Sequence, residues 1–404
     1  MALKLEQLQG RVIDLDSHEQ IPAPKWKDAF GERGERFLAA SESLVKFSAE
    51  VFGHESLMYD VDDVMEITPK TVWETKMSKA PSAANMDRRP AVLDAMGIHR
   101  ALVFPTFGLL ALISSNGGGV GGTALASEDE VATAFAALDA YNEWAGALTS
   151  KYPDRMRVLG VLSSGKPGLT VDGLIAETKR LIKLGVRGVF ISAGRPPAGL
   201  SPADPALDPW YATLAEANVS LVFHAGGGAG FMSSEIWGAR PEFTYRFTPD
   251  CESAGGPYMA AGIHVAEENF ITVMVLGGVL ERHPTLRVGA IELFAHWIGP
   301  LAERLDFFCD KGRHMDWLGA KNLSLKPSEY LNRQVRVTPA VYEPVEKYVE
   351  RYPYLEDVYC YSTDYPHPEG NKWSMKRFYD RLAPHVSDRF LEKFFVTNGQ
   401  LLVP

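Results

Sequence analysis

Histidine and carboxylate side chains gather at the ends of several β-forming runs of the chain. The residues with this placement are Asp16, His18, His224, Glu292, His296 and Asp364. Asp16 and His18 stand two residues apart, so in an extended strand their side chains point to the same side. Neutral imidazole and carboxylate groups together suit Zn²⁺, Mn²⁺ or Fe²⁺. The pattern therefore predicts a divalent-metal site that holds one or two ions per chain.

Such a site can do acid–base chemistry on water. A metal with an open coordination position lowers the pKa of a bound water towards ~7, and a nearby carboxylate can take that proton and pass it to a leaving group. We expect the metal ligands to be Asp16, His18, His224, Asp364, Glu292 and His264, and the catalytic residues to be Asp364, Glu292 and His296. His367, just after the eighth β-rich run, could be either a ligand or structural, whereas His54, His99, His283 and His385, which fall in helices or turns, are expected to be structural.

Eight β-rich runs, each followed by a stretch with helical spacing, would position these residues. The runs cover residues 11–16, 100–105, 156–162, 186–192, 219–224, 286–292, 334–338 and 357–364. Most are continuously apolar, as in strands that are covered on both faces. The alternation predicts a (β/α)₈ TIM barrel, with an open doubly wound sheet as the alternative. Active sites of barrels lie at the carboxyl ends of the strands, where the candidate residues stand.

Two stretches interrupt this rhythm within what we expect to be a single domain over residues 1–404. Residues 20–90 are predicted to form an inserted helical subdomain or lid, whose aromatic residues would contact substrate, form its own core or make an oligomer interface. Residues 113–130 are a glycine-rich loop in which Gly117, Gly119 and Gly122 match G-x-G-x-x-G. The preceding strand ends about ten residues too early for a dinucleotide fingerprint, which favours a plain loop.

The amino-acid composition indicates which kinds of molecule this protein is expected to bind. The 404 residues carry 41 Lys and Arg against 51 Asp and Glu, a net charge of −10, which argues against a nucleic-acid partner. The three cysteines form no disulfide framework, and the N-terminal residues lack an apolar signal region. The longest apolar run, residues 271–280, is about half a membrane span. We expect a cytoplasmic protein that acts on a small molecule.

Four strings carry a family resemblance: VIDLDSHEQIP, SPADPALDPWYATLAEANVSLVFHAGG, GGVLERHPTLRVGAIELFAHWIGPLAERLD and STDYPHPEG. Together they resemble the amidohydrolase-related family, the aminocarboxymuconate-semialdehyde-decarboxylase-like branch of the amidohydrolase superfamily. The resemblance implies a distorted (β/α)₈ barrel with a divalent metal at the strand ends. It also implies that Asp16 and His18 are the strand-one ligands, His224 the strand-five ligand, and Asp364 the strand-eight ligand and proton shuttle.

The chain departs from this family at three positions. Asp16-x-His18 replaces the usual His-x-His, Ile21 stands where a glutamate is usual, and Glu292 replaces a strand-six histidine. Glu19, the nearest substitute for the missing glutamate, would point to the other face of the strand.

Several functions are compatible with these residues. The first is a metal-dependent hydrolase or non-oxidative decarboxylase of a small organic acid or amide. The second is a dinuclear iron or manganese hydroxylase (a monooxygenase) of a small carboxylic or amino acid, as one subunit of a hetero-oligomer. The third is a structural subunit with a degenerate metal site. In each case we expect an oligomer, either of identical chains or with a related subunit.

Overall fold

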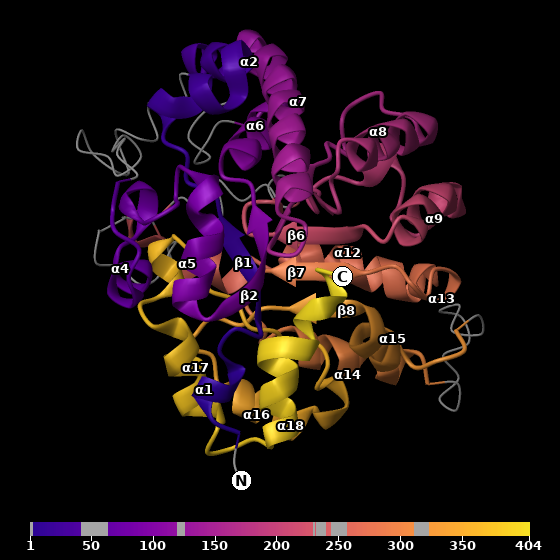
Figure 1. The fold of residues 1–404 in the computed structure, drawn as a ribbon. Helices are drawn as coiled ribbons and strands as arrows, with labels where there is room; N and C mark the ends of the chain where they lie inside the picture. The colour runs from indigo at the N-terminus through magenta and orange to yellow at the C-terminus, as the bar shows by residue number, and fades with distance from the viewer. Residues whose placement is uncertain are drawn as a thin grey trace.

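Parallel strands alternate with helices along the chain, as Figure 1 shows. The computed structural model describes residues 3–41, 64–118, 126–228, 231, 240–243, 257–310 and 323–404. Three strands form one parallel sheet: β1 (Val12–His18), β2 (Ile98–Phe104) and β3 (Met156–Val158). Five form a second: β4 (Gly160–Val161), β5 (Gly188–Phe190), β6 (Ser220–His224), β7 (Val288–Ile291) and β8 (Val335–Val337).

The two sheets join at both sides. On one side β3 and β4 are the two halves of a single predicted strand, and the N–H of Leu159 between them donates to Val103 O over 2.9 Å. On the other side residues 358–365 run between β8 and β1. They form only isolated bridges, from Tyr359 to Val337 and from Tyr365 to Ser17. The ring thus has eight positions, which confirms the predicted barrel, although the eighth position is not a regular strand.

Helices surround the strands. They are α1 (Leu5–Leu8), α2 (Trp26–Ala40), α4 (Pro69–Glu74), α5 (Arg89–Met96), α6 (Phe107–Ser115), α7 (Glu128–Lys151), α8 (Val171–Lys183), α9 (Asp208–Glu216), α11 (Pro257–Gly262), α12 (Val265–Leu276), α13 (Val279–Arg282), α14 (Ile298–Phe308), α15 (Pro327–Gln334), α16 (Val345–Arg351), α17 (Ser374–Leu382) and α18 (Asp388–Glu392). Thr170 caps α8 by accepting the N–H of Gly173, and α9 begins at the Asp208–Pro209 start signal. No helix in the described ranges is long and apolar enough to cross a membrane.

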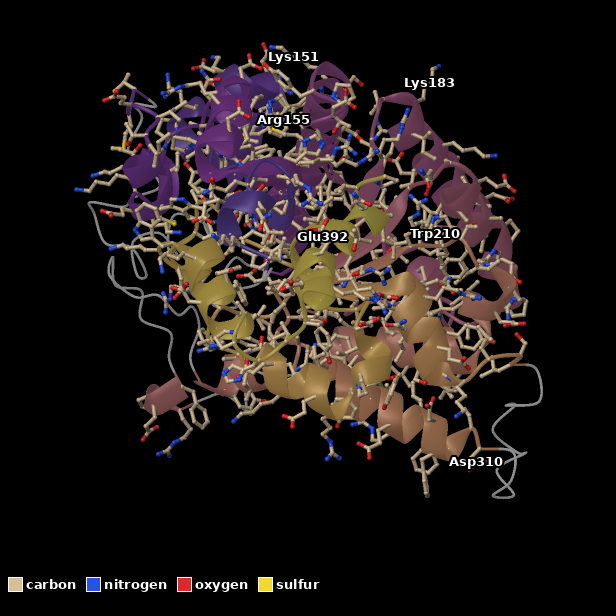
Figure 2. All side chains as sticks on the ribbon, turned by 60° about the horizontal axis from the view of Figure 1, so that its bottom comes forward. Lys151, Arg155, Lys183, Trp210, Asp310 and Glu392 are labelled. Carbon is tan, nitrogen blue, oxygen red and sulfur yellow. The ribbon has the colours of Figure 1, made fainter. Side chains whose placement is uncertain are left out.

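The outer surface is charged and the strands are apolar. Lys151 and Lys183 point outward from α7 and α8 in Figure 2. All seven residues of β1 are buried, as the continuous apolar runs predicted. At the floor of the barrel the tail docks through Leu402 and Val403, which are both buried. A Cβ at Gly289 would lie 2.8 Å from the Cδ1 of Leu402, so a larger residue there would require this side chain to shift.

The start of the predicted insertion packs on the outer helices. Phe30 of α2 stacks on Phe107 of α6 at 4.0 Å between ring centroids, and Trp26 meets the same ring at 4.7 Å. Figure 1 shows α2, α6 and α7 side by side. Trp26 is therefore a core residue. Residues 42–63, which contain Phe47, Phe52 and Tyr59, lie outside the described ranges, as do Gly119 and Gly122.

Candidate metal centre

Strands β1 and β6 bring the first three candidate ligands together. Asp16 and His18 share one side of β1, with 3.3 Å between Asp16 Oδ1 and His18 Nε2. His224 is the last residue of β6, and its Nε2 lies 3.4 Å from the same oxygen of Asp16. The Nδ1 of His224 lies 3.0 Å from Ala225 O, which leaves Nε2 as the atom that faces the group.

Asp364 joins from the eighth position of the barrel. Its N–H donates to Asp16 O over 2.8 Å, and its Oδ1 lies 3.4 Å from His18 Nε2. Asp14 braces this junction, because its carboxylate accepts the N–H of Asp16 and both the N–H and the hydroxyl of Thr363. Burial raises the pKa of Asp14 to about 7 although these hydrogen bonds lower it. Hydrogen bonds between β1 and residues 363–364 thus hold the carboxylates of Asp16 and Asp364 close together.

Glu292 lies at the outer edge of this group of side chains. It follows β7 directly, and its Oε2 lies 3.2 Å from His224 Nε2. A quarter of its side chain is exposed, whereas the side chains of Asp16 and His18 are almost fully buried. Glu292 therefore stands between the buried group and the mouth of the barrel.

These side chains form overlapping groups whose ligand atoms lie within 4.8 Å of one another. One group is Asp16, His18, His224 and Glu292; the second is His18, Asp364 and His367; the third is Glu292, Asp364 and Glu369. Buried atoms of this set make no hydrogen bond within the described part of the chain, namely both carboxylate oxygens of Asp16 and Asp364, both ring nitrogens of His18 and the Nε2 of His224. Native proteins rarely leave buried polar atoms unsatisfied, so the donor set fits a cation at this place.

Burial and the charges of neighbouring side chains shift the pKa values of these residues. Burial raises the pKa of Asp364 well above its ordinary value, and the charges of Glu369 and Asp16 raise it further. Burial and the charge of Asp364 likewise raise the pKa of Glu292 well above its ordinary value. The pKa of Asp16 is lowered overall, because the imidazoles of His224 and His18 outweigh its burial. A cation would relieve the repulsion among these carboxylates.

Histidine 367 and Gln20 support the group although only His367 was a sequence candidate. The ring of His367 stacks on His18 at 4.0 Å between centroids, and its Nδ1 lies 3.1 Å from Asp364 Oδ1. Its Nε2 lies 3.0 Å from Gln20 Oε1. The run from Asp364 to Glu369 just after the eighth position was the signal that could also have revealed Glu369 as a member.

Glu19 does not face the metal groups. Its Oε1 accepts the N–H groups of Thr106 and Phe107 over 2.8 and 2.6 Å, and its Oε2 accepts that of Ile21 over 3.1 Å. The position next to His18 on the strand turns this side chain to the opposite face. Burial raises the pKa of Glu19 to about 7 although the backbone hydrogen bonds lower it.

His264 and His296 lie together but outside these groups. Their ring centroids are 4.9 Å apart. His264 Nε2 lies 3.4 Å from Glu268, and His296 Nδ1 lies 3.7 Å from Glu343. The structure thus brings together five of the predicted side chains and leaves these two beside them.

Aromatic and cationic residues enclose the inner side. The ring of Phe104, the last residue of β2, lies 4.2 Å from that of His224, and Phe190 lies 6.4 Å from it. From α5 the buried guanidinium of Arg89 donates to His18 O over 2.7 Å. The sequence offered no signal for Arg89, because its partner is a backbone carbonyl 71 residues away.

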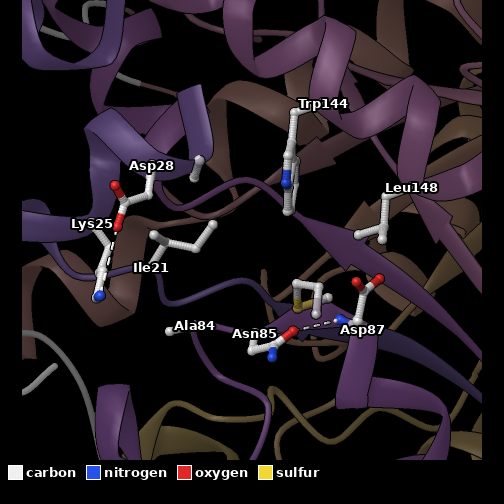
Figure 3. A pocket seen from close by; sticks show the side chains of 10 residues that line it. Ile21, Lys25, Asp28, Ala84, Asn85, Asp87, Trp144 and Leu148 are labelled. Atoms are coloured by element: carbon white, nitrogen blue, oxygen red, sulfur yellow. Dashed lines mark hydrogen bonds and ion pairs between the residues drawn. The ribbon is translucent and has the colours of Figure 1, made fainter. Parts of the chain in front are cut away.

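A separate pocket of about 450 Å³ lies between the start of α2 and α7, as Figure 3 shows. Ile21, Trp144 and Leu148 line it. Its carboxylates are engaged with lysines, since Asp28 lies 3.6 Å from Lys25 and Asp87 lies 2.7 Å from Lys151. None of the candidate metal ligands lines this pocket, so it is not the candidate metal centre.

Comparison with solved structures shows the same architecture. An amidohydrolase from Mycobacterium avium subsp. paratuberculosis K-10 superposes with a TM-score of 0.64 at 20% identity, over 98% of each chain. A 5-carboxyvanillate decarboxylase from Novosphingobium aromaticivorans, in complex with manganese and 4-hydroxy-3-methoxy-5-nitrobenzoic acid, gives 0.58 at 18% identity over 97% of this chain and 96% of that one. A 2,6-dihydroxybenzoate decarboxylase from Rhizobium gives 0.54 at 15% identity over 97% and 98%.

At these identities the likeness concerns the fold. A search of curated proteins finds no significant match. The family model described as amidohydrolase matches residues 117–319, which is half of the chain. The sequence motifs and this match agree, and the protein belongs to the amidohydrolase family.

Proposed function

We propose that this chain is a metal-dependent enzyme that hydrolyses or non-oxidatively decarboxylates a small organic acid or amide. Asp16, His18, His224 and Asp364 are its proposed metal ligands. The observation that carries the proposal is the convergence of buried, unsatisfied donor atoms from these four residues. The manganese in the 5-carboxyvanillate decarboxylase structure supports a divalent ion such as Mn²⁺, with Zn²⁺ and Fe²⁺ as alternatives.

A bound divalent cation would supply a Lewis acid that polarises a substrate oxygen or acidifies water. The chain itself provides the proton carrier. Burial and the neighbouring charges of Glu369 and Asp16 raise the pKa of Asp364 above its ordinary value, which favours proton uptake by its carboxylate. In decarboxylation it would give that proton to the carbon that loses CO₂. In hydrolysis it would take a proton from water and deliver it to the leaving group.

Glu292 and the aromatic rings define the substrate's surroundings. Glu292 is positioned at the mouth and carries a second proton-binding carboxyl group beside His224. Phe104 and Phe190 exclude water from the inner side of His224 and offer an apolar surface to a ring or a short chain. We therefore place Asp364 and Glu292 as the catalytic acid–base groups. His296, which is 44% exposed, is proposed to contact the outer end of the substrate.

A second candidate function has its own supporting observation. The third group, Glu292, Asp364 and Glu369, shares two carboxylates with the groups around His18 and His224. Shared carboxylates and an excess of negative charge favour two cations over one. Such a pair would suit a dinuclear iron or manganese hydroxylase of a small carboxylic or amino acid.

Removal of single ligands tests the metal assignment. We expect His224→Ala, which removes a donor atom, to weaken Mn²⁺ binding by at least about 100-fold and to abolish turnover. Asp364→Asn keeps a carbonyl oxygen but loses the charge and the proton carrier, so we expect it to abolish turnover with a smaller loss of Mn²⁺ affinity. His385→Ala and Asp380→Asn, which alter exposed residues outside the centre, are matched controls. Metal binding and circular dichroism are measured on the same preparations. Normal Mn²⁺ affinity in a folded His224→Ala protein would contradict the assignment.

Reaction products then separate the candidate functions. A panel of small acids and amides is incubated under nitrogen with the metal-loaded enzyme in D₂O. Release of CO₂ with deuterium on the product identifies decarboxylation, and a new acid–amine pair identifies hydrolysis. Two ions per chain with O₂ consumption would instead support the hydroxylase. A protein that binds no metal and becomes active only with a related chain would support the structural subunit.

We also propose that the protein forms an oligomer, as the inserted aromatic residues predict. Light scattering on the purified protein, alone and with a co-expressed related chain, tests this. A single monomeric species in both preparations would exclude it.

A further inference from the structure

The turn that carries Glu292 has an unfavourable backbone. Glu292 and Phe294 both adopt positive φ, at 55° and 58°. Residues with a side chain rarely occupy this region, and they persist there only where the surroundings impose the conformation. The turn lies between the end of β7 at Ile291 and the start of α14 at Ile298. Two such residues within three positions need a restraint from outside the turn.

The segment after β8 provides this restraint at both ends of the turn. The hydroxyl of Thr338 accepts the N–H of Glu292 over 3.0 Å. The carboxylate of Glu343 accepts the N–H of Ala295 over 3.0 Å and that of His296 over 3.1 Å. Thr338 and Glu343 are both buried. The turn is therefore attached through its backbone to the neighbouring segment of the barrel.

Glu343 is itself fixed in place. Its carboxylate also accepts the N–H of Ala340 over 2.7 Å and the hydroxyl of Tyr348 over 3.2 Å. Four donor groups thus converge on one buried carboxylate. An ionised carboxylate suits this role because it only accepts hydrogen bonds, whereas an amide would direct an NH₂ group at backbone N–H groups.

We propose that Glu343 is a positioning residue that aims Glu292 at His224. The turn carries Glu292, whose Oε2 lies 3.2 Å from His224 Nε2, so a change in the turn would move this carboxylate relative to the imidazole. Groups that orient metal ligands in this way typically change metal affinity by about 10–100-fold when they are replaced. This inference rests on the proposed metal site, to which it adds Glu292 as a further ligand because its carboxylate lies in one group of ligand atoms with Asp16, His18 and His224.

A double-mutant cycle in the full-length protein tests whether Glu343 acts through Glu292. Mn²⁺ affinity is measured for the unmodified protein, Glu343→Gln, Glu292→Gln and the double variant. We expect Glu343→Gln to weaken binding about 10–100-fold in the first background and less than about twofold when Glu292 is already replaced. Glu350→Gln, which alters an exposed residue seven positions later on α16, is the matched control and should leave affinity unchanged. Equal losses in both backgrounds, or no loss at all, would overturn the proposal.

Hydrogen exchange provides a readout that does not depend on metal. In the metal-free protein, the amides of Ala295 and His296 should exchange at least about tenfold faster in Glu343→Gln than in the unmodified protein or in Glu350→Gln. Unchanged exchange in this turn would reject the role of Glu343. If the unmodified protein fails to bind Mn²⁺, the proposed function falls, while the exchange result still decides whether Glu343 holds the turn.

Discussion

Most of the buried carboxylates in question here have one of two kinds of surroundings. Some accept several backbone N–H groups and act as braces, as Asp14, Glu19 and Glu343 do. Others converge on imidazoles and have unsatisfied oxygens, as Asp16 and Asp364 do. The first kind fixes segments of the chain, and the second kind is suited to a cation. The residue type alone does not distinguish the two, since the difference lies in which donors surround each oxygen.

Glu267 belongs to neither kind and allows a prediction about stability. It is fully buried on α12, neither oxygen has a hydrogen-bond partner in the described ranges, and burial raises its pKa to about 8. The folded protein keeps this proton between about pH 4.5 and 8, whereas the unfolded chain releases it. Stability attributable to Glu267 therefore falls as pH rises through that window.

We expect Glu267→Gln to stabilise the protein by about 1–3 kcal/mol at pH 8 and to have little effect at pH 5. Urea unfolding at the two pH values measures the difference. Glu268→Gln is not a suitable control because Glu268 pairs with Arg304, so exposed Glu350→Gln is used. A gain of the same size at both pH values would show that the proton on Glu267 is not responsible.

Among the candidate residues, the sequence could predict those placed by strand periodicity. Asp16 and His18 alternate with Ser17 on β1, and His224 ends an apolar run, so their convergence followed from the barrel itself. The bracing role of Glu343 could not be predicted. Its partners are backbone N–H groups 47 and 48 residues away, and such contacts leave no pattern of residue types.

At the scale of elements, the N-terminus of α6 is capped by Glu19, which directly follows strand β1. The free N–H groups of a helix N-terminus need acceptors, and Glu19 at the end of β1 supplies one to Thr106 and Phe107. The start of α6 is thereby fixed to the segment next to His18. It also carries Phe107, on which α2 packs.

We expect Glu19→Gln to lower the free energy of unfolding by about 1–3 kcal/mol, because an amide cannot accept all three N–H groups that the carboxylate binds. Chemical denaturation measures the loss. Glu128→Gln, which alters an exposed residue in the first turn of α7, should cost less than about 0.5 kcal/mol. If both variants lost the same small amount, the capping role of Glu19 would be refuted.

The eight β segments were predictable, but their pairing was not. Apolar runs report burial, and burial is the same whether a strand has a regular ladder on both sides or isolated bridges. Residues 156–161 change from one sheet to the other at Leu159, and residues 358–365 contact β1 only at separate points. Both irregularities depend on how the barrel closes, which involves segments hundreds of residues apart.

At the scale of the whole molecule, the candidate centre joins distant parts of the chain. Asp16 and His18 come from β1, His224 from β6 and Asp364 from the last position of the barrel. A cation held by all four would bind the folded chain and not the unfolded one. The binding energy then adds to the stability of the barrel as a whole.

We expect Mn²⁺ at 100 times its dissociation constant to raise the free energy of unfolding by about 2.7 kcal/mol, and a chelator to reverse the gain. Thermal unfolding with and without Mn²⁺ measures it. The same addition should leave His224→Ala unaffected, while His385→Ala should respond like the unmodified protein. Equal stabilisation of His224→Ala would place the bound ion elsewhere.

The distance along the chain between β1 and Asp364 also has a consequence for biosynthesis. At about 5–20 residues per second, a ribosome makes Asp364 roughly 20–70 s after His18. During that interval the nascent chain holds only part of the proposed ligand set, so it cannot select an ion as the finished barrel does. On this assignment, the metal that the enzyme carries is determined by the ions available to the released polypeptide, and a product of premature termination before codon 364 would be unable to retain it.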